Sequence, residues 1–542
     1  MEKKELARLE IWKQLALHAA GFDAPERHLR HLTQDPQRLA HFSASGGGLF
    51  LDLSRQRLDH KAMELLVKLA RQRDVMPKMR QMATGATVNT TENRSALHMA
   101  ARDFSGSAIA VSGADVMPEI RRVRDEIRRF AADVHDGRVV GSTGKRFADV
   151  VVIGIGGSYL GTEFVAEALK ADAVEGVRLH FLSNVDIHCF GRIADAIDPE
   201  RTLWVVISKS FTTAETMANA AQASAYMQEK GLDPSRHTVA VTAKGSPGDD
   251  GRQPALAVFH MFDFIGGRYS VTSAVGGVPL SLLFGYERFE RFLKGAEEMD
   301  RHVLTAAEDQ NLPLLAALTS LWNHNFLGYT AGAIIPYAAP LHKLAPHIQQ
   351  LNMESNGKSA TADGRLLDVE TGPFLFGEPG TNAQHSFFQL AHQGRAFPIE
   401  FIGVLQPQPA YRGYAHRSRG VSNHQELYAN LVAQAQALAL GRDGDEAARR
   451  FTGNRPSTTI LLNELSPENI GRLLAFYEAK TVMEGFLWGI NPFDQFGVEL
   501  GKQLAAGIRE KMAAMNADPA ATFDDLDPIS RHYLERLFAA AK

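Results

Sequence analysis

The sequence predicts an α/β protein built on mainly parallel sheets, and three observations support this fold class. From Ala148 onward, apolar segments rich in β-branched residues alternate with segments of helical spacing. Each apolar segment is continuous rather than alternating, which is typical of strands buried on both faces of a parallel sheet. Several of these segments end in a glycine- or serine-rich turn just before a predicted helix, as in sheets connected by right-handed crossovers.

The strand–helix alternation is clearest in the middle of the chain. We expect four strands, at 148–157, 177–184, 201–210 and 237–245. A helix at 158–171 follows the first strand, a short helix follows the second, and a long helix at 212–230 follows the third. We therefore expect one parallel sheet with helices on both of its faces.

The two ends of the chain predict a second α/β layer structure. Residues 1 to about 115 have helical spacing around a strand-like segment at 47–54, and residues 1–15 predict an amphipathic helix. Beyond about residue 282 long helices dominate, with further strand candidates at 331–338, 397–406 and 456–465. Glycine- and proline-rich stretches at 243–254, 361–382 and 441–457 are expected to be loops, because their residues suit turns.

Length and composition exclude several classes of protein. The chain has 542 residues, enough for two to four domains of roughly 150 residues each. Its net charge of −4 and the lack of a basic stripe argue against a nucleic-acid partner. A single cysteine, Cys189, excludes an intramolecular disulfide and a multi-cysteine metal site. Without a signal peptide or a run of about 18 apolar residues, we expect a cytoplasmic protein with no membrane partner.

A glycine-rich turn at 154–157, followed by Ser158, predicts a first anion site. It lies where a strand becomes a helix, so unpaired backbone N–H groups and a partial positive charge point at the turn. A dinucleotide fingerprint G-x-G-x-x-G would need its third glycine at Tyr159, and the next glycine is Gly161. A tight turn without a ligand is the alternative interpretation.

The segment Ser208–Thr213 predicts a second anion site. It follows a buried strand, opens a helix and offers four hydroxyls and the ammonium of Lys209, a set that suits a phosphate monoester. One of these hydroxyls is expected to serve as the N-cap of the helix. Since ligands of such sheets bind at the carboxyl ends of the strands, the two turns together indicate a phosphorylated small molecule. No Walker-type motif supports nucleotide hydrolysis.

Candidate acid–base groups lie outside this block. Glu354 and His385 both occur in polar, glycine-containing surroundings, and Arg268 follows two glycines that could admit a ligand. For each of them, and for Lys502, a solvated or structural role is the alternative. His342 and His347 are five residues apart and no H-E-x-x-H pair occurs, so we expect no metal site.

Seven segments together resemble the glucose-6-phosphate isomerase family. They are NTTENRSALHMAAR, IGIGGSYLG, SKSFTTAET, GGRYSVTSA, QQLNMESNGKS, GEPGTNAQHSFFQLAHQG and NPFDQFGVELGK, in this order, and they run from residue 89 to 502. Ser210 stands where the family usually has threonine, and Glu400 where it generally has aspartate. Neither departure removes a proposed catalytic group.

The resemblance implies a fold, an assembly and a reaction. The expected fold is two sugar-isomerase-type α/β/α sandwich domains with helical N- and C-terminal extensions, namely a smaller domain at 115–285, a larger one from 1–114 and 286–505, and a C-terminal helical arm at 506–542. The expected reaction is the interconversion of glucose 6-phosphate and fructose 6-phosphate through a cis-enediolate, without a metal or organic cofactor. The family resemblance also implies a homodimer with active sites near the subunit interface.

The resemblance assigns roles to individual residues. The groups expected to bind the phosphate are Gly157, Ser158, Ser208, Lys209, Ser210, Thr212 and Thr213. Glu354 would move the proton between C1 and C2, and Arg268 would stabilise the enediolate. His385, supplied by the neighbouring subunit, and Lys502 would assist ring opening, and Gln350 would position the sugar.

Three alternatives remain at this point. A dinucleotide-dependent oxidoreductase is suggested by the glycine turn, although the missing third glycine argues against it. A non-catalytic sugar-phosphate sensor would share the same fold, but four acid–base candidates argue against that reading. An isomerase of another phosphosugar, such as mannose 6-phosphate, would use the same groups.

Overall fold

The computed structural model describes residues 6–518 and 520–540. The chain divides into two compact units, the first ending at Phe493 and the second running from Asp494 to Lys542. The second unit holds helices α18 (Glu499–Ala517) and α19 (Pro528–Ala540). The first unit contains both large sheets and is the one in which the candidate site can be built.

A five-stranded parallel sheet forms the middle of the first unit. Its strands, in the order β6-β5-β7-β8-β9, are β6 (Arg178–Leu182), β5 (Asp149–Ile153), β7 (Thr202–Ile207), β8 (Thr238–Ala243) and β9 (Ala257–Met261). All four pairings are parallel, which confirms the predicted sheet. Only β9, an edge strand of mixed polarity, was not expected.

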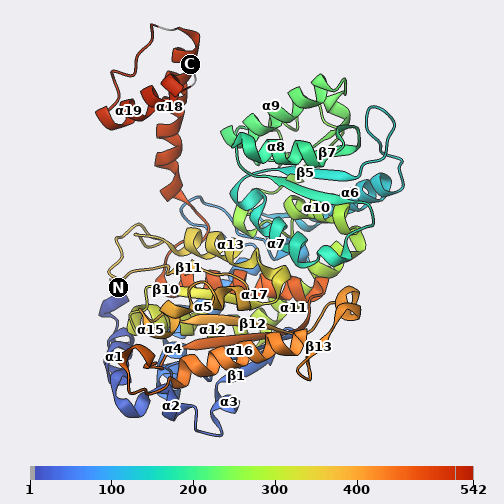
Figure 1. Cartoon of the computed structure of the whole chain (residues 1–542). Coiled ribbons are helices and arrows are strands. Elements are labelled where there is room, and N and C mark those ends of the chain that lie inside the picture. Colours follow the sequence, from blue (N-terminus) through green and yellow to red (C-terminus); the bar gives the residue numbers. More distant parts are fainter. Residues whose placement is uncertain (1–5, 519, 541–542) are drawn as a thin grey trace. The chain divides into compact units, whose positions relative to one another are not determined.

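Helices cover both faces of this sheet, as the continuous apolar strands predict (Figure 1). One face carries α8 (Ile187–Ala196) and α9 (Ala214–Glu229), and the other carries α6 (Met117–His135) and α10 (Ala274–Phe284). Successive residues of β5 serve different cores: Val151 packs with the α8–α9 side and Val152 with the opposite side. Burial on both faces is therefore what the β-branched run encodes.

A six-stranded mixed sheet is assembled from both ends of the first unit. Its order is β1-β2-β15-β12-β10-β11, with β1 (Ser43–Gly46), β2 (Leu49–Asp52), β15 (Ser457–Glu464), β12 (Ile399–Gln406), β10 (Ala331–Tyr337) and β11 (Phe374–Phe376). The four strands β11, β10, β12 and β15 run parallel, and β2 and β1 are antiparallel additions. The predicted second layer structure is thus confirmed as an α/β arrangement.

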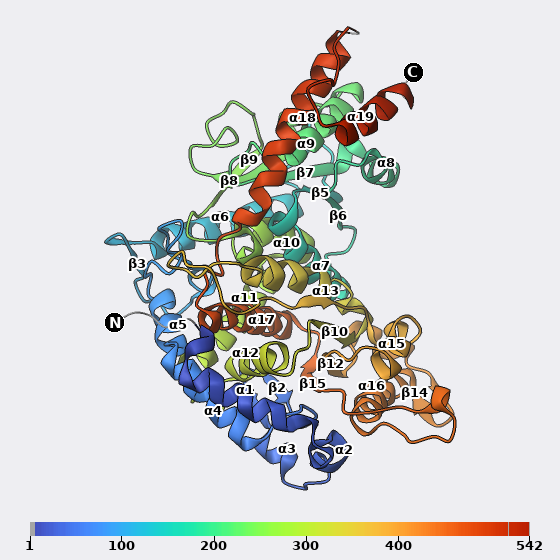
Figure 2. The same cartoon turned by 90° about the vertical axis from the view of Figure 1, so that its left-hand side faces the viewer.

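The faces of the six-stranded sheet are also covered (Figure 2). Helix α16 (Asn423–Leu440) contacts β10, β12 and β15, whereas α17 (Pro467–Trp488) contacts β15 and β2 and packs along α11 (Tyr286–Thr305) and α12 (Leu312–Leu321). Almost every side chain of α17 is buried. This helix is the central element that the site described below rests on.

The described chain also contains nine further α-helices, two π-helices and four two-residue strands. They are α1 (Glu10–Ala20), α2 (Leu29–Leu32), α3 (Arg38–His41), α4 (His60–Gln72), α5 (Val75–Ala83), α7 (Leu160–Ala168), α13 (Leu344–Ile348), α14 (Gly380–Gln384), α15 (Phe388–Gln393), the π-helices η10 (Trp322–Phe326) and η12 (Gln349–Glu354), and the two-residue strands β3 (Ala110–Val111), β4 (Ala114–Asp115), β13 (Arg417–Ser418) and β14 (Val421–Ser422).

Three local expectations need correction. The helix expected at 1–15 begins instead at Glu10, after a 3-10 turn at Leu6–Arg8, and residues 1–5 lie outside the described part of the chain. Strand β1 was not predicted, because its SASG sequence carries almost no apolar signal. The loop expected at 361–382 contains β11 and the start of α14, since a three-residue edge strand is too short to show periodicity. The predicted domain boundaries stay a prediction.

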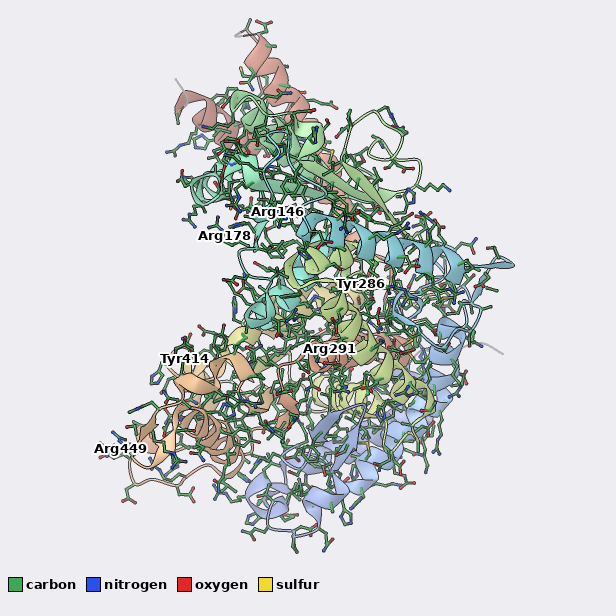
Figure 3. All side chains as sticks on the ribbon, turned by 90° about the vertical axis from the view of Figure 1, so that its right-hand side faces the viewer. Arg146, Arg178, Tyr286, Arg291, Tyr414 and Arg449 are labelled. Atoms are coloured by element: carbon green, nitrogen blue, oxygen red, sulfur yellow. The ribbon has the colours of Figure 1, made fainter. Side chains whose placement is uncertain are left out.

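A buried carboxylate and two basic side chains lie at the amino ends of the strands of the five-stranded sheet. Asp149, at the start of β5, is fully buried and accepts hydrogen bonds from Arg178 Nη2 and His180 Nε2, each at 2.9 Å. Arg178 lies at the outer edge of this sheet (Figure 3). These contacts hold the pKa of Asp149 below its ordinary value, although burial alone would raise it. Because these charged groups are paired with one another, the amino ends of the strands offer no free charge from this group to a ligand. Ligands of parallel sheets bind at the carboxyl ends of the strands.

Within the described part of the chain, every helix is too short or too polar to cross a membrane.

Candidate active site

The two predicted anion turns lie side by side at the carboxyl edge of the five-stranded sheet. Strands β5 and β7 are neighbours, and Ile153 pairs with Val206 just before the turns begin. A Cβ placed on Gly154 would lie 3.4 Å from the carbonyl oxygen of Ile207. The predicted proximity of the two turns is therefore confirmed.

The glycine turn makes a backbone-to-backbone contact that admits no side chain. A Cβ on Gly157 would lie 2.2 Å from the carbonyl carbon of Gly267 and 2.6 Å from the nitrogen of Arg268. Gly156 adopts a φ of +58°, and a Cβ on it would lie 3.0 Å from Nε2 of Gln350. The glycines thus bring the turn against Arg268 on one side and Gln350 on the other.

The hydroxyls of the serine turn are organised around one another. Ser208 Oγ is buried, accepts from the backbone N–H of Phe211 at 3.1 Å and lies 3.3 Å from Thr213 Oγ1. Thr212 Oγ1 donates to Ser210 Oγ at 2.7 Å. Thr213 occupies the N-cap position of α9, but its hydroxyl makes no capping hydrogen bond in the described chain. The expectation that one hydroxyl caps this helix is therefore wrong.

Phe211 has an unusual backbone conformation within the serine turn. Its φ is +52°, a left-handed value that is rare for a bulky residue. The ring is buried on the α9 side of the sheet, and a Cβ on Gly248 would lie only 2.7 Å from it. Strained residues of this kind persist where the surrounding structure holds them, and they cluster at ligand sites. Burial of the Phe211 ring is what holds the strained turn in place.

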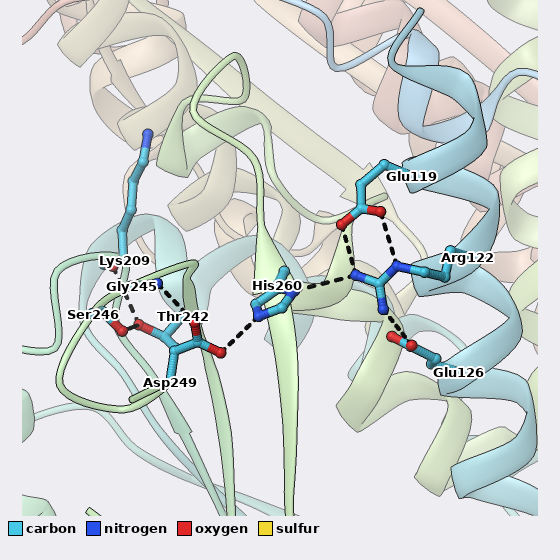
Figure 4. Close-up of polar contacts among 9 residues, drawn as sticks. All are labelled: Glu119, Arg122, Glu126, Lys209, Thr242, Gly245, Ser246, Asp249 and His260. Carbon is cyan, nitrogen blue, oxygen red and sulfur yellow. Dashed lines mark hydrogen bonds and ion pairs between the residues drawn. The ribbon is translucent and has the colours of Figure 1, made fainter. Parts of the chain in front are cut away.

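The backbone of Lys209 is held by the carboxyl end of β8 (Figure 4). Its carbonyl oxygen accepts from the N–H of Ala243 at 3.0 Å and from Thr242 Oγ1 at 3.2 Å. Thr242 Oγ1 in turn lies 2.7 Å from Ser246 Oγ. The side chain of Lys209 points away from this group, and its Nζ lies 3.1 Å from Oδ1 of Asp263.

An ion-pair relay from α6 supports the loop that follows β8 (Figure 4). Asp249 accepts from the N–H of Gly245 and from His260 Nε2, both at 2.7 Å. Arg122 Nη2 lies 3.2 Å from His260 Nδ1 and is itself paired with Glu119. Because a guanidinium can only donate, Nδ1 of His260 is the acceptor in its contact with Arg122 and Nε2 is the donor to Asp249.

Glu354 faces Arg268 across the carboxyl edge of the sheet. Arg268 Nη1 lies 3.8 Å from Glu354 Oε1, and the side chain of the arginine is 2% exposed while that of the glutamate is 22% exposed. Arg268 also donates from Nε to Ser355 Oγ at 2.6 Å and from Nη2 to the carbonyl of Pro492 at 2.8 Å. A partly open carboxylate beside a fixed, buried cation is an arrangement suited to proton abstraction next to a developing oxyanion.

Gln350 and Glu354 lie on the same π-helix, η12. The Oε1 atom of Gln350 is buried and has no hydrogen-bond partner among the described residues. Buried polar atoms normally have a partner, so an unpaired acceptor beside the glycine turn indicates a site for a ligand or water donor.

Two predicted residues are not joined to this cluster by the structure. His385 lies at the end of α14, where its side chain is exposed. Lys502 is exposed on α18 of the second unit. Their roles in ring opening stay predictions.

Two neighbours of the predicted residues were not singled out from the sequence. Tyr269 OH lies 3.0 Å from Ser355 Oγ, and both side chains are buried behind Arg268. Burial raises the pKa of Tyr269 to about 12, so its phenol stays protonated and can donate. Both residues stand next to Arg268 and Glu354 in the sequence, which is the signal that could have found them.

Among the described residues, no three His, Cys, Asp or Glu side chains form a group that could hold a metal ion.

Comparisons with known proteins identify the family. The family described as phosphoglucose isomerase matches residues 52–525. A glucose-6-phosphate isomerase of Desulfosudis oleivorans is 62% identical over 541 residues, covering 99% of both chains. A cytosolic glucose-6-phosphate isomerase of Arabidopsis thaliana is 44% identical over 93% of this chain and 92% of its own. The chain belongs to the phosphoglucose isomerase family.

Solved structures agree with this assignment. The crystal structure of a glucose-6-phosphate isomerase from Chlamydia trachomatis matches with a TM-score of 0.89 at 38% identity, covering 99% of this chain and all of that one. A hypothetical protein from Thermus thermophilus matches with a TM-score of 0.63 at 26% identity, over 83% of this chain and 99% of its own. The predicted fold class is confirmed by these matches.

Proposed function

We propose that this chain catalyses the reversible isomerisation of glucose 6-phosphate and fructose 6-phosphate. The family assignment and the names of the relatives support this reaction. The observation that carries it is the Arg268–Glu354 pair at 3.8 Å, next to the turn that contains Gly157. An aldose–ketose shift needs this combination of one carboxylate, one adjacent cation and one grip for the substrate's remote end.

Each group has a distinct role in the proposed reaction. Glu354 removes the proton from C2 of the opened aldose and returns it to C1, while the hydroxyl proton of O2 moves to O1, so that no net proton is gained or lost. The negative charge that develops on the oxygen atoms of the cis-enediolate lies beside Arg268. Because Arg268 is buried, its electrostatic interaction with this charge is stronger than it would be in water. Gln350 positions the sugar between them.

The phosphate holds the substrate away from the reacting carbons. Its proposed ligands are the backbone of Gly157 and the side chains of Ser158, Ser208, Lys209, Ser210, Thr212 and Thr213. Binding energy from such a remote group can be used to orient the reacting atoms, an effect of up to several kcal/mol.

Ring opening and assembly complete the proposal. His385 of a neighbouring subunit and Lys502 assist opening of the hemiacetal in a homodimer, and the exposure of His385 on α14 is consistent with that role. The cytosolic relatives support a cytoplasmic location.

The sharpest test replaces the proposed base by its amide. Glu354→Gln keeps the size of the side chain but cannot accept the proton, so kcat should fall about 10³-fold, within the usual range for a general base. The control is Glu370→Gln, an exposed glutamate in the loop before β11, which should leave kcat unchanged. Activity should be assayed with fructose 6-phosphate and with mannose 6-phosphate. Unchanged turnover in Glu354→Gln would show that the base is another group.

A further inference from the structure

A buried carboxylate lies directly behind the segment that carries Glu354. Glu484 of α17 has no exposed side-chain surface. Its Oε2 atom accepts from Asn352 Nδ2 at 2.5 Å and from Asn356 Nδ2 at 3.0 Å. One oxygen atom of α17 therefore holds two side chains of the active-site segment, on either side of Glu354 in the sequence.

The segment it holds has an intrinsically weak backbone. Residues Gln349–Glu354 form a π-helix, a geometry that is rare and occurs mostly at functional sites. Such a turn depends on tertiary contacts for its shape. Helix α17 comes close enough to supply them because Gly485 has no side chain, and a Cβ there would lie 3.2 Å from Asn356 Oδ1.

Arg268 fixes the other side of the same segment. It donates to Ser355 Oγ at 2.6 Å, while its Nη1 lies 3.8 Å from the carboxylate of Glu354. Residues 352 and 356 are thus tied to α17, and residues 354 and 355 face Arg268. The position of the proposed base relative to Arg268 is set by contacts from two directions.

A lysine neutralises the buried carboxylate. Lys480 Nζ lies 3.4 Å from Glu484 Oε1 and 3.0 Å from Glu400 Oε1. Burial alone would lower the pKa of Lys480, but these two carboxylates raise it, so the ammonium stays charged. Lys480 keeps a partner when either glutamate is removed, although Glu400, unlike Glu484, is 22% exposed and also accepts from Tyr477 OH at 3.0 Å.

We propose that Glu484 is a positioning residue for the reaction, holding η12 so that Glu354 meets the substrate carbon beside Arg268. This inference rests on the proposed function, in which Glu354 is the base. A mutation far from the reacting atoms that misplaces a reacting group by about 1 Å can cost about 100-fold in rate. Glu484 acts through Asn352 and Asn356 and touches no substrate atom.

The test compares two substitutions that remove one carboxylate each from Lys480. Glu484→Leu should lower kcat about 100-fold and change KM less than about threefold, because the phosphate turns are untouched. Glu400→Leu is the matched control, since Glu400 lies on β12 and has no bond to η12; its kcat should stay within about threefold. Glu484→Gln keeps an acceptor oxygen for both asparagines and should recover activity to within about threefold.

Three further measurements keep the inference open to refutation. Thermal unfolding of each variant separates loss of fold from loss of position. If Glu484→Leu does not fold, Asn352→Leu, which has the same number and branching of side-chain heavy atoms and leaves both carboxylates in place, should show the same fall in kcat. A kcat within threefold in folded Glu484→Leu, or equal losses in Glu400→Leu, would overturn the inference. Glu354→Gln is measured in parallel: if it stays active, the assigned base fails instead.

Discussion

The turn that is proposed to hold the phosphate and the segment that carries Glu354 are built in opposite ways. The Ser208–Thr213 turn is held largely by its own hydroxyls and by the strand and loop beside it. The η12 segment is held by Arg268 and Glu484, which are more than 80 and 120 residues away in the sequence. The Ser208–Thr213 turn is therefore held mainly by contacts close in the sequence, whereas η12 is held by buried charged residues far away in the sequence.

This difference separates binding from chemistry. Substitutions in the local turn should weaken the grip on the remote phosphate and so act mainly on KM. Substitutions around η12 should shift the base or the cation and act mainly on kcat. Substitutions at four further positions test this division of roles.

After Glu354→Gln, the largest effect is expected at Arg268. Arg268→Gln removes the charge beside the developing enediolate, and kcat should fall about 10²- to 10³-fold, as when one oxyanion donor is lost. KM should change far less. Steady-state kinetics are compared with Arg291→Gln, a partly exposed arginine on α11 that pairs with Glu468 (Figure 3). A change confined to KM would place Arg268 on the binding side of the comparison.

A second test concerns stability on the η12 side. His347, on α13 just before η12, is buried, and burial lowers the pKa of its ring from 6.5 to about 4. Between these two pH values the unfolded chain binds a proton that the folded chain does not, so the free energy of unfolding falls as the pH falls. The loss amounts to about 3 kcal/mol over the full range.

His347→Phe should remove this part of the pH dependence, since the new ring can keep the stacking on Phe164, whose centroid lies 5.8 Å away. Chemical unfolding at several pH values between 7 and 4 measures the difference. His342→Phe, at an exposed position on the same stretch of chain, should leave the slope as it is. Parallel pH curves for the two variants would contradict the account.

A smaller effect is expected at Lys209. Lys209→Met keeps the length of the side chain but removes the charge that we propose for the phosphate, so KM should rise about tenfold while kcat changes less than about threefold. The control is Lys244→Met, an exposed lysine in the loop after β8. A fall in kcat at constant KM would mean that the turn takes part in the chemistry.

The smallest effect is expected at Asp263. Its carboxylate lies 3.1 Å from Lys209 Nζ and is 76% exposed, so it competes with an incoming phosphate for the same cation. Asp263→Asn should lower KM by about twofold, since surface ion pairs contribute about 0–1 kcal/mol. The gain should shrink at high salt. A higher KM in the variant would mean that the aspartate orients Lys209 for binding.

The local parts of the molecule could be predicted from the sequence. Strands β5 and β7 and the turns that follow them were identified because the apolar run, the glycines and the hydroxyls are adjacent in the chain. Their meeting at one edge followed from parallel topology. The edge strands β9 and β11 were missed because they are too short to show a clear periodicity, and β1 was missed because its SASG sequence carries almost no apolar signal.

The long-range parts could not be predicted in this way. Nothing in the letters around Glu354 shows that Glu484 lies behind it or that Tyr269 and Ser355 meet behind Arg268. The first contact arises from the packing of α17 against η12 and the second from the turn at Gly267–Tyr269 lying against the end of η12, and periodicity encodes neither. Resemblance to the family supplied the residues, and the structure supplied the reason that they are held in place.

In the proposed reaction a carboxylate moves a proton between neighbouring carbons, and isomerisation in deuterated water distinguishes this step from a hydride shift. Fructose 6-phosphate is converted by the chain in D₂O, and the sugar is analysed by NMR and mass spectrometry. Transfer through Glu354 predicts that solvent deuterium enters at C1 or C2, to an extent set by exchange at the carboxyl group. Complete turnover with no deuterium at either carbon, in repeated and prolonged reactions, would indicate a hydride shift and contradict the account.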